Sequence, residues 1–215
     1  MRLDGTATGH SGEGSRGGLT RGAHKACEHA LGCKEQETPC GIVDEASGQL
    51  RLRCGRSYNT SDCMVDALAA WGYTWDAQEH TATKSIHITM DHGPERSGRR
   101  TPCLHRMVPF VEAIGKPVQW LSDPPSPSKD KPIERCWGIV ARHWNGTPLI
   151  HVDTRLEWAK RMTWKGLQPI VELRHTVYQK GISLGKKALQ AVEARLQRHS
   201  ELPRWDILIR PISTA

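Results

Sequence analysis

Hydrophobic and polar residues alternate with the period of a β-strand in several separate segments. Residues 49–54 show this pattern, and a second strand is predicted at residues 38–43. The turn-forming residues 44–48 lie between them, so the pair predicts a β-hairpin. Residues 85–90 predict another strand, with Ile86, Ile88 and Met90 on one face. Further strands are predicted at residues 117–121 and 204–211, and residues 2–4 resemble the end of a first strand.

Other segments repeat their apolar residues with the period of an α-helix. One helix is predicted after the capping segment 60–62, with apolar residues at Met64, Val65, Leu68 and Trp71. Further helices are predicted around residues 104–111, after Pro132, at residues 154–162 and at residues 185–199. Four prolines within residues 123–132 predict an extended loop. The order of strands and helices predicts a mixed α/β fold.

Composition and charge narrow the class of protein. The chain has 215 residues, and 30 Lys+Arg against 23 Asp+Glu give a formal net charge of +7, which favours a polyanionic partner. No apolar run approaches the roughly 20 residues that span a bilayer, and residues 1–22 contain no apolar signal segment. Seven cysteines without an export signal favour free thiols in a reducing compartment. We therefore expect a cytoplasmic protein with no membrane partner.

Three acidic residues lie where predicted elements end or begin. Asp4 is the last residue of the predicted first strand, Asp91 follows the strand at 85–90, and Glu134 is in the first turn of the helix after Pro132. Carboxylates are the ligands that Mg²⁺ prefers, and two such ions can hold the attacking and leaving oxygens of a phosphodiester. In a chain with 23 acids, ordinary surface or capping carboxylates explain the same spacing.

The residues around these acids form motifs that are more specific. Residues 91–95 read Asp-His-Gly-Pro-Glu, residues 99–101 read Arg-Arg-Thr, and residues 132–138 read Pro-Ile-Glu-Arg-Cys-Trp-Gly. Together with residues 143–146, 162–166 and 178–182, they resemble the Rhodopirellula-type DDE transposases of insertion sequences. The resemblance extends upstream to Asp4 and covers essentially the whole chain.

This resemblance implies an RNase H-like fold, a mixed sheet flanked by helices, with a helical C-terminal extension. It makes residues 1–150 the catalytic core and residues 151–215 the extension. Asp4, Asp91 and Glu134 would be the catalytic, metal-binding acids, holding Mg²⁺ or Mn²⁺ and two ions in all. The implied activity is DNA strand cleavage at transposon ends and transfer of the freed 3′-OH to target DNA, by a homo-oligomer assembled on DNA in the nucleoid.

The chain departs from the family pattern at several positions. His92 stands where the family has Asn, and Ser126, Pro127, Asp130 and Lys131 also differ from the pattern. Only three residues precede Asp4, whereas the family has a longer first strand and a DNA-recognition region before it. We therefore expect an N-terminally truncated core with weak transposition activity. A catalytically inactive DNA-binding remnant is the first alternative.

Two clusters of chemically active residues border or precede the predicted site. Arg99, Arg100, Lys129 and Arg135 flank the acids and are predicted to contact DNA phosphates. Five potential zinc ligands lie within residues 24–40, namely His24, Cys27, His29, Cys33 and Cys40. No Cys-x-x-Cys pair is present, so idle reduced thiols are favoured, and a zinc-binding interaction module is the second alternative.

Overall fold

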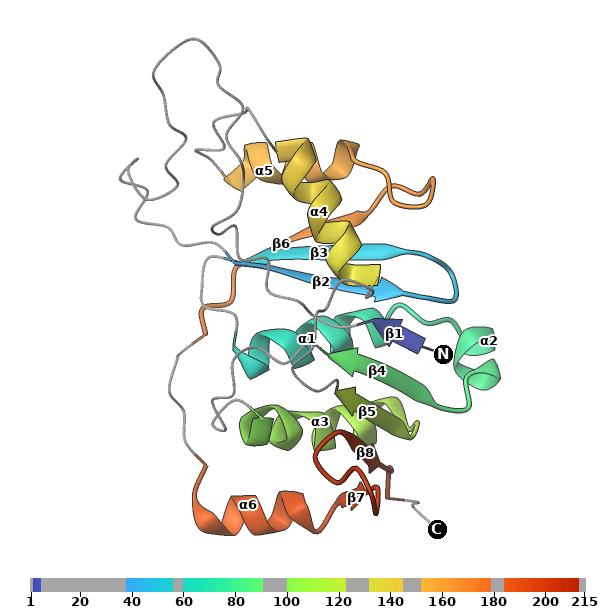
Figure 1. The fold of residues 1–215 in the computed structure, drawn as a ribbon, viewed down its shortest axis with the longest axis vertical. Helices are drawn as coiled ribbons and strands as arrows, with labels where there is room; N and C mark the ends of the chain where they lie inside the picture. The colour runs from blue at the N-terminus through green and yellow to red at the C-terminus, as the bar shows by residue number, and fades with distance from the viewer. Residues whose placement is uncertain are drawn as a thin grey trace.

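The computed structural model describes residues 2–4, 38–55, 60–90, 100–122, 132–144, 152–178 and 184–212. Within these residues one mixed sheet of eight strands runs in the order β6-β3-β2-β1-β4-β5-β8-β7 (Figure 1). The strands are β1 (Arg2–Asp4), β2 (Thr38–Asp44), β3 (Leu50–Gly55), β4 (Ile86–Met90), β5 (Val118–Ser122), β6 (Ile170–Arg174), β7 (Leu196–Arg198) and β8 (Asp206–Ile209).

The central strands run in mixed directions. β1 is parallel to β4, and β4 is parallel to β5, whereas β2 is antiparallel to both β1 and β3. The connection from β2 to β3 is a tight hairpin in which Gly48 adopts a φ of 75°, a conformation that glycine adopts at little cost. This arrangement is the RNase H-like mixed α/β fold that the resemblance implies.

Six helices accompany the sheet in the described part of the chain: α1 (Ser61–Gly72), α2 (Ala77–Ala82), α3 (Arg100–Ile114), α4 (Pro132–Trp144), α5 (Val152–Arg161) and α6 (Lys186–Glu193). The start of α1 is where the sequence predicts it, since the side chain of Thr60 accepts a hydrogen bond from the Cys63 amide. Pro109 lies inside α3. No helix among the described residues has the length and apolar character needed to cross a membrane.

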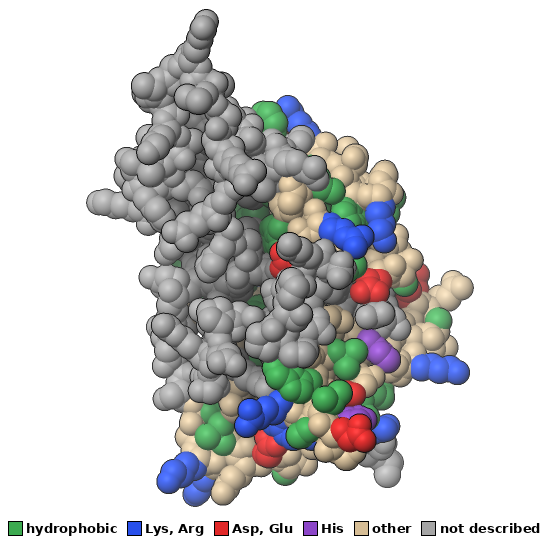
Figure 2. All heavy atoms as spheres, viewed as in Figure 1, with side chains coloured by type: hydrophobic (Ala, Val, Ile, Leu, Met, Phe, Trp, Pro, Cys, Tyr) green, Lys and Arg blue, Asp and Glu red, His purple; other side chains and the backbone are tan. Residues whose placement is uncertain are grey.

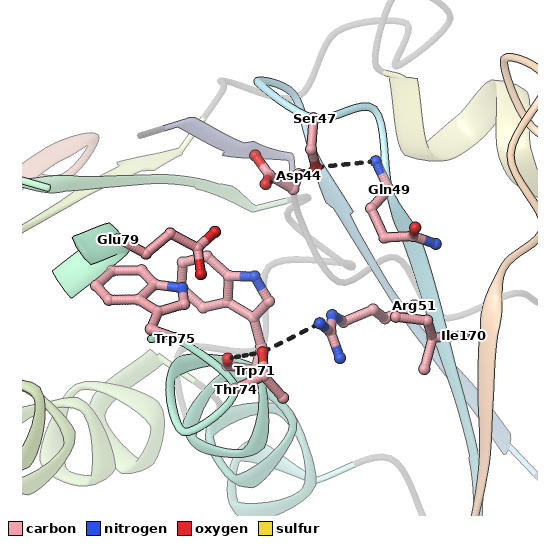
Figure 3. Close-up of a pocket in the computed structure, with 9 residues that line it drawn as sticks. All are labelled: Asp44, Ser47, Gln49, Arg51, Trp71, Thr74, Trp75, Glu79 and Ile170. Atoms are coloured by element: carbon pink, nitrogen blue, oxygen red, sulfur yellow. Dashed lines mark hydrogen bonds between the residues drawn. The ribbon is translucent and has the colours of Figure 1, made fainter. Parts of the chain in front are cut away.

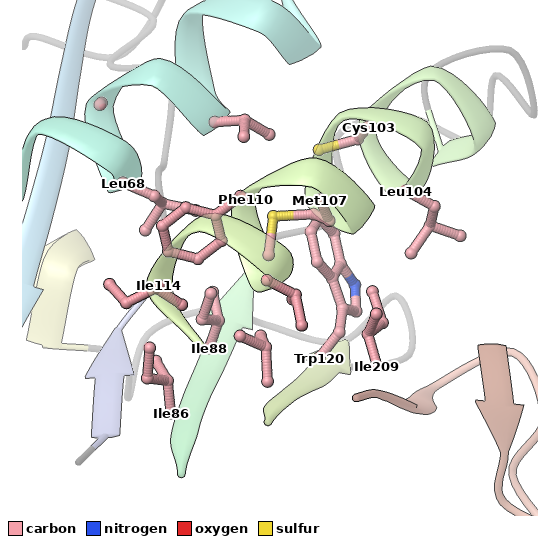
Figure 4. Close-up of a cluster of buried hydrophobic side chains, with 14 of the residues drawn as sticks. Leu68, Ile86, Ile88, Cys103, Leu104, Met107, Phe110, Ile114, Trp120 and Ile209 are labelled. Atoms are coloured by element: carbon pink, nitrogen blue, oxygen red, sulfur yellow. The ribbon is translucent and has the colours of Figure 1, made fainter. Parts of the chain in front are cut away.

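Two apolar clusters attach the helices to opposite faces of the sheet. The larger cluster joins α1 and α3 to the inner strands through side chains such as Leu68, Met107, Phe110, Ile88 and Trp120 (Figure 4). The second cluster joins α4 and α5 to the β2–β3 hairpin, and Figure 1 shows α4 lying across these two strands. Alternate residues along each strand therefore point to opposite faces of the sheet and pack against different layers of helices.

The last third of the chain differs from its sequence-based prediction. The helix predicted at residues 185–199 ends at Glu193, and Leu196–Arg198 forms strand β7 instead. Its antiparallel pairing with β8 supplies backbone hydrogen bonds that a longer helix would forgo. The sequence pattern did not predict α2 or β6. Residues 151–215, which were expected to be mostly helical, contribute the three strands β6, β7 and β8 to the sheet. The proline-rich loop at 123–131 lies outside the described residues.

Candidate active site

Asp4 is the last residue of β1 and lies in the middle of the sheet. It pairs with Val43 of β2 on one side and with Thr89 of β4 on the other. Because β1 and β4 are parallel, their carboxyl ends meet at one edge of the sheet. Asp91 comes two residues after Thr89 in the sequence, but Asp91 itself and the side chain of Asp4 lie outside the described structure.

Glu134 reaches this region on the first turn of α4, which packs against β2 at a glycine. A Cβ atom added to Gly41 would lie 2.9 Å from Cδ1 of Ile133 and 2.9 Å from Cζ2 of Trp137. The missing side chain therefore lets the helix approach the strand closely. Gly41 is two residues from Val43, the partner of Asp4, so its Cα lies about 8 Å from that of Asp4 by standard strand geometry.

The apolar face of α4 fixes how the acid is presented. Ile133, Cys136 and Val140 are fully buried against the hairpin. Glu134 is half-buried beside this face, and Arg135 is exposed on the far side of the helix. A carboxylate at the margin of a buried helix face is held by the packing of its neighbours and still faces the solvent. Trp137 packs against the same cluster.

The structure does not describe the positions of all three acidic side chains, because Asp91 and the side chain of Asp4 lie outside the described residues. The structure brings the backbone of Asp4 and the first turn of α4 to neighbouring positions around β2, and the convergence of all three side chains stays a prediction. No group of three potential metal-ligating side chains is present among the residues whose side chains are described. The donor set itself suits a hard divalent cation, because it consists of carboxylates from two strand ends and one helix start.

Of the four predicted DNA-binding side chains, the structure describes only that of Arg135. Arg99 and Lys129 lie outside the described residues, and Arg100 is the first residue of α3, with its side chain not described. Arg135 is exposed on α4. Figure 2 shows Lys and Arg side chains dispersed over the described part of one face, with no single basic patch there.

A partly buried polar network, which was not predicted from the sequence, centres on Asp66 of α1. The carboxylate of Asp66 accepts hydrogen bonds from Arg174 (2.8 Å), Tyr178 (2.6 Å) and Arg106 (2.7 Å). Arg174 also donates to the backbone carbonyl of Cys63 at 3.0 Å. Burial, followed by the hydrogen bond to Asp66, raises the pKa of Tyr178. These residues are far apart in sequence, so no local pattern could have revealed the network, which attaches β6 to α1.

The Cys40 thiol belongs to this same buried region. It lies in the larger apolar cluster, and its side chain is hydrogen-bonded to that of Cys63. The hydrogen bond from Cys40, with the guanidinium of Arg174 close by, lowers the pKa of Cys63 to about 7. The other four members of the proposed zinc cluster, His24, Cys27, His29 and Cys33, lie outside the described residues.

A small hollow of about 270 Å³ opens on the α1 side of the sheet, and none of the predicted site residues lines it (Figure 3). Trp71, Trp75, Glu79 and Arg51 form much of its wall. Asp44 also lines it, but its carboxylate accepts hydrogen bonds from the Ala46 amide (3.0 Å) and the Ser47 hydroxyl (2.7 Å). Asp44 therefore stabilises the hairpin turn, and the sheet separates this hollow from α4.

Comparison with known proteins bears directly on the family. A family model, the Rhodopirellula transposase DDE domain, matches residues 2–211 of the chain. No curated protein and no solved structure matches the chain. The match covers residues 4, 91 and 134, the positions of the three predicted acids, and it includes every described strand. The chain therefore belongs to the family of Rhodopirellula transposase DDE domains.

Proposed function

We propose that this transposase domain cleaves DNA at the ends of an insertion sequence and joins the freed 3′-OH to target DNA. Asp4, Asp91 and Glu134 are its catalytic residues and hold two divalent ions, Mg²⁺ or Mn²⁺. The observation that carries the proposal is the close packing of α4 on Gly41, which lies two residues from Val43, the strand partner of Asp4. This packing supports a shared site for Asp4 and Glu134, which are 130 positions apart in sequence.

The side chains of this site bind and orient the reacting groups. When bound, divalent ions supply activation of the attacking oxygen and stabilisation of the leaving oxygen. The two strand-end carboxylates fix one side of the site, because a strand in the middle of a sheet is held by hydrogen bonds on both edges. Glu134 closes the other side, with its position set by the buried face of α4.

DNA is held by cations around the acids. We assign phosphate contacts to Arg99, Arg100, Lys129 and Arg135, in keeping with the net charge of +7. The proposal includes a homo-oligomer on DNA, since the two transposon ends must be brought together, and a location in the cytoplasmic nucleoid. It also keeps residues 1–150 as the catalytic core and residues 151–215 as an extension.

The test is cleavage and strand transfer on labelled DNA in Mg²⁺ and in Mn²⁺. The unaltered chain is compared with Glu134→Gln and with Glu157→Gln, a control acid on α5 whose partner is the exposed Lys160. We expect metal-dependent products that Glu134→Gln loses and Glu157→Gln keeps. DNA binding without any product in either metal would favour the inactive remnant, and zinc retained after purification would favour the zinc-binding module.

A further inference from the structure

Thr89 differs from the other buried polar residues of the described structure because its side chain has no hydrogen-bond partner there. Four polar or charged residues are buried there, namely Asp44, Thr89, Ser122 and Arg174. Asp44 bonds to Ser47, Ser122 accepts a hydrogen bond from Trp120, and Arg174 bonds to Asp66. The hydroxyl of Thr89 has no hydrogen-bond partner among the described residues, although Thr89 is only 7% exposed.

The position of Thr89 in the sheet is specific. Strand pairing places it in one row that crosses five strands, Leu50–Val43–Asp4–Thr89–Leu121. Partners in register share a face of the sheet, and Val43 packs in the cluster under α4. The preceding residue, Ile88, packs in the cluster on the opposite face. Thr89 and Asp4 are thus adjacent polar positions in an otherwise apolar row on the α4 face.

A buried hydroxyl without a partner is costly, and such groups are rare in native proteins, so each needs a physical explanation. Adjacent strands lie about 4.8 Å apart, so a threonine hydroxyl can donate to a carboxylate at the neighbouring register position. Carboxylates that ligate metals are themselves commonly held by such hydrogen bonds. The row therefore offers one donor directly beside one predicted ligand.

We propose that Thr89 is a positioning residue, whose hydroxyl donates a hydrogen bond to the carboxylate of Asp4 and orients it toward the bound divalent ions. This inference rests on the proposed function, because it takes Asp4 as a metal ligand. It predicts that the hydroxyl lacks a partner in the metal-free protein and gains one when the site is loaded.

The prediction is a pair of effects with opposite sign, measured on Thr89→Val and Thr89→Ser. Valine replaces the hydroxyl with a methyl group of similar size, so metal-free Thr89→Val should unfold about 2–4 °C higher than the unaltered chain. The same variant should bind Mn²⁺ at least about 10-fold more weakly by calorimetric titration. Thr89→Ser keeps the donor and should bind Mn²⁺ within about threefold of the unaltered chain.

Mn²⁺ binding by Glu134→Gln distinguishes a failure of the Thr89 inference from a failure of the proposed metal site. If Glu134→Gln weakens Mn²⁺ binding while Thr89→Val binds normally, the inference about Thr89 is wrong and the metal site stands. If Glu134→Gln binds Mn²⁺ as the unaltered chain does, the proposed metal site fails first. A metal-free Thr89→Val that is less stable than the unaltered chain would show that the hydroxyl is already bonded, and would also overturn the inference.

Discussion

Replacing Gly41 with alanine should displace the helix that carries Glu134. The added Cβ would lie 2.9 Å from both Ile133 and Trp137, whereas an ordinary contact is 3.4 Å or more. The difference, 3.4 minus 2.9, means that both neighbours must retreat by at least 0.5 Å. The contacted atom of Trp137 belongs to a rigid ring, so relief requires a shift of α4 itself.

The magnitude follows from packing. Inserting a methyl group into a filled interface costs about 1–3 kcal/mol, and a displacement approaching 1 Å at a catalytic group can cost about 100-fold in rate. We therefore expect Gly41→Ala to lower the free energy of unfolding by about 1–2 kcal/mol, because alanine recovers part of the cost through its better strand propensity. Metal-dependent DNA cleavage should fall at least about 10-fold.

Two other glycines provide matched controls for denaturant unfolding and DNA cleavage assays. A Cβ on Gly72 would lie 2.3 Å from Cδ1 of Ile114, so Gly72→Ala should also destabilise the fold, but at the α1–α3 contact. A Cβ on Gly138, on the exposed side of α4, would meet nothing within 4 Å, so Gly138→Ala should stabilise by about 0.5–1 kcal/mol. Both controls should cleave DNA normally, and normal cleavage by a destabilised Gly41→Ala would refute the reasoning.

Three further predictions concern charge. Arg135→Ala should flatten the slope of log affinity against log salt for duplex DNA by about 0.9, and an unchanged slope would remove Arg135 from the DNA contacts. The Arg195 side chain and the Ile212 amide lower the pKa of Glu112, so its stabilisation is present above the unfolded pKa of about 4.3 and is lost as pH falls through the folded pKa. The melting temperatures of the unaltered chain and Glu112→Gln should therefore differ at pH 7, and the difference should shrink as the pH falls below about 4.3. A constant difference would contradict this. Asp66→Asn removes the charge that Arg174 faces and should lower the unfolding free energy by about 2–3 kcal/mol in urea, whereas a loss under about 0.5 kcal/mol would show that the network contributes little.

Much of the fold could be predicted from local pattern. The β2–β3 hairpin, the Thr60 cap and the apolar face of α4 each depend on residues close in sequence, and all three are confirmed. β7 could not be predicted this way, because Leu196–Arg198 becomes a strand only through its pairing with β8. Tertiary pairing overrode a helical pattern there.

The candidate site was predicted less completely. Motifs around Asp91 and Glu134 pointed to the family, which the family match confirms. The role of Gly41 was not predicted, although a glycine inside a strand is a known sign of close backbone approach. Thr89 carried no sequence signal of its own, since a threonine in a strand is ordinary until its burial and register are known.

The central claim is that Asp4, Asp91 and Glu134 bind the same divalent ions. The most direct measurement is a crystal structure of the chain grown with Mn²⁺, with the ions located by anomalous scattering. We predict Mn²⁺ between the ends of β1 and β4 and the first turn of α4, with carboxylate oxygens of all three acids about 2.0–2.2 Å away. Mn²⁺ bound elsewhere, or any one of the three acids across the molecule from the other two, would contradict the claim.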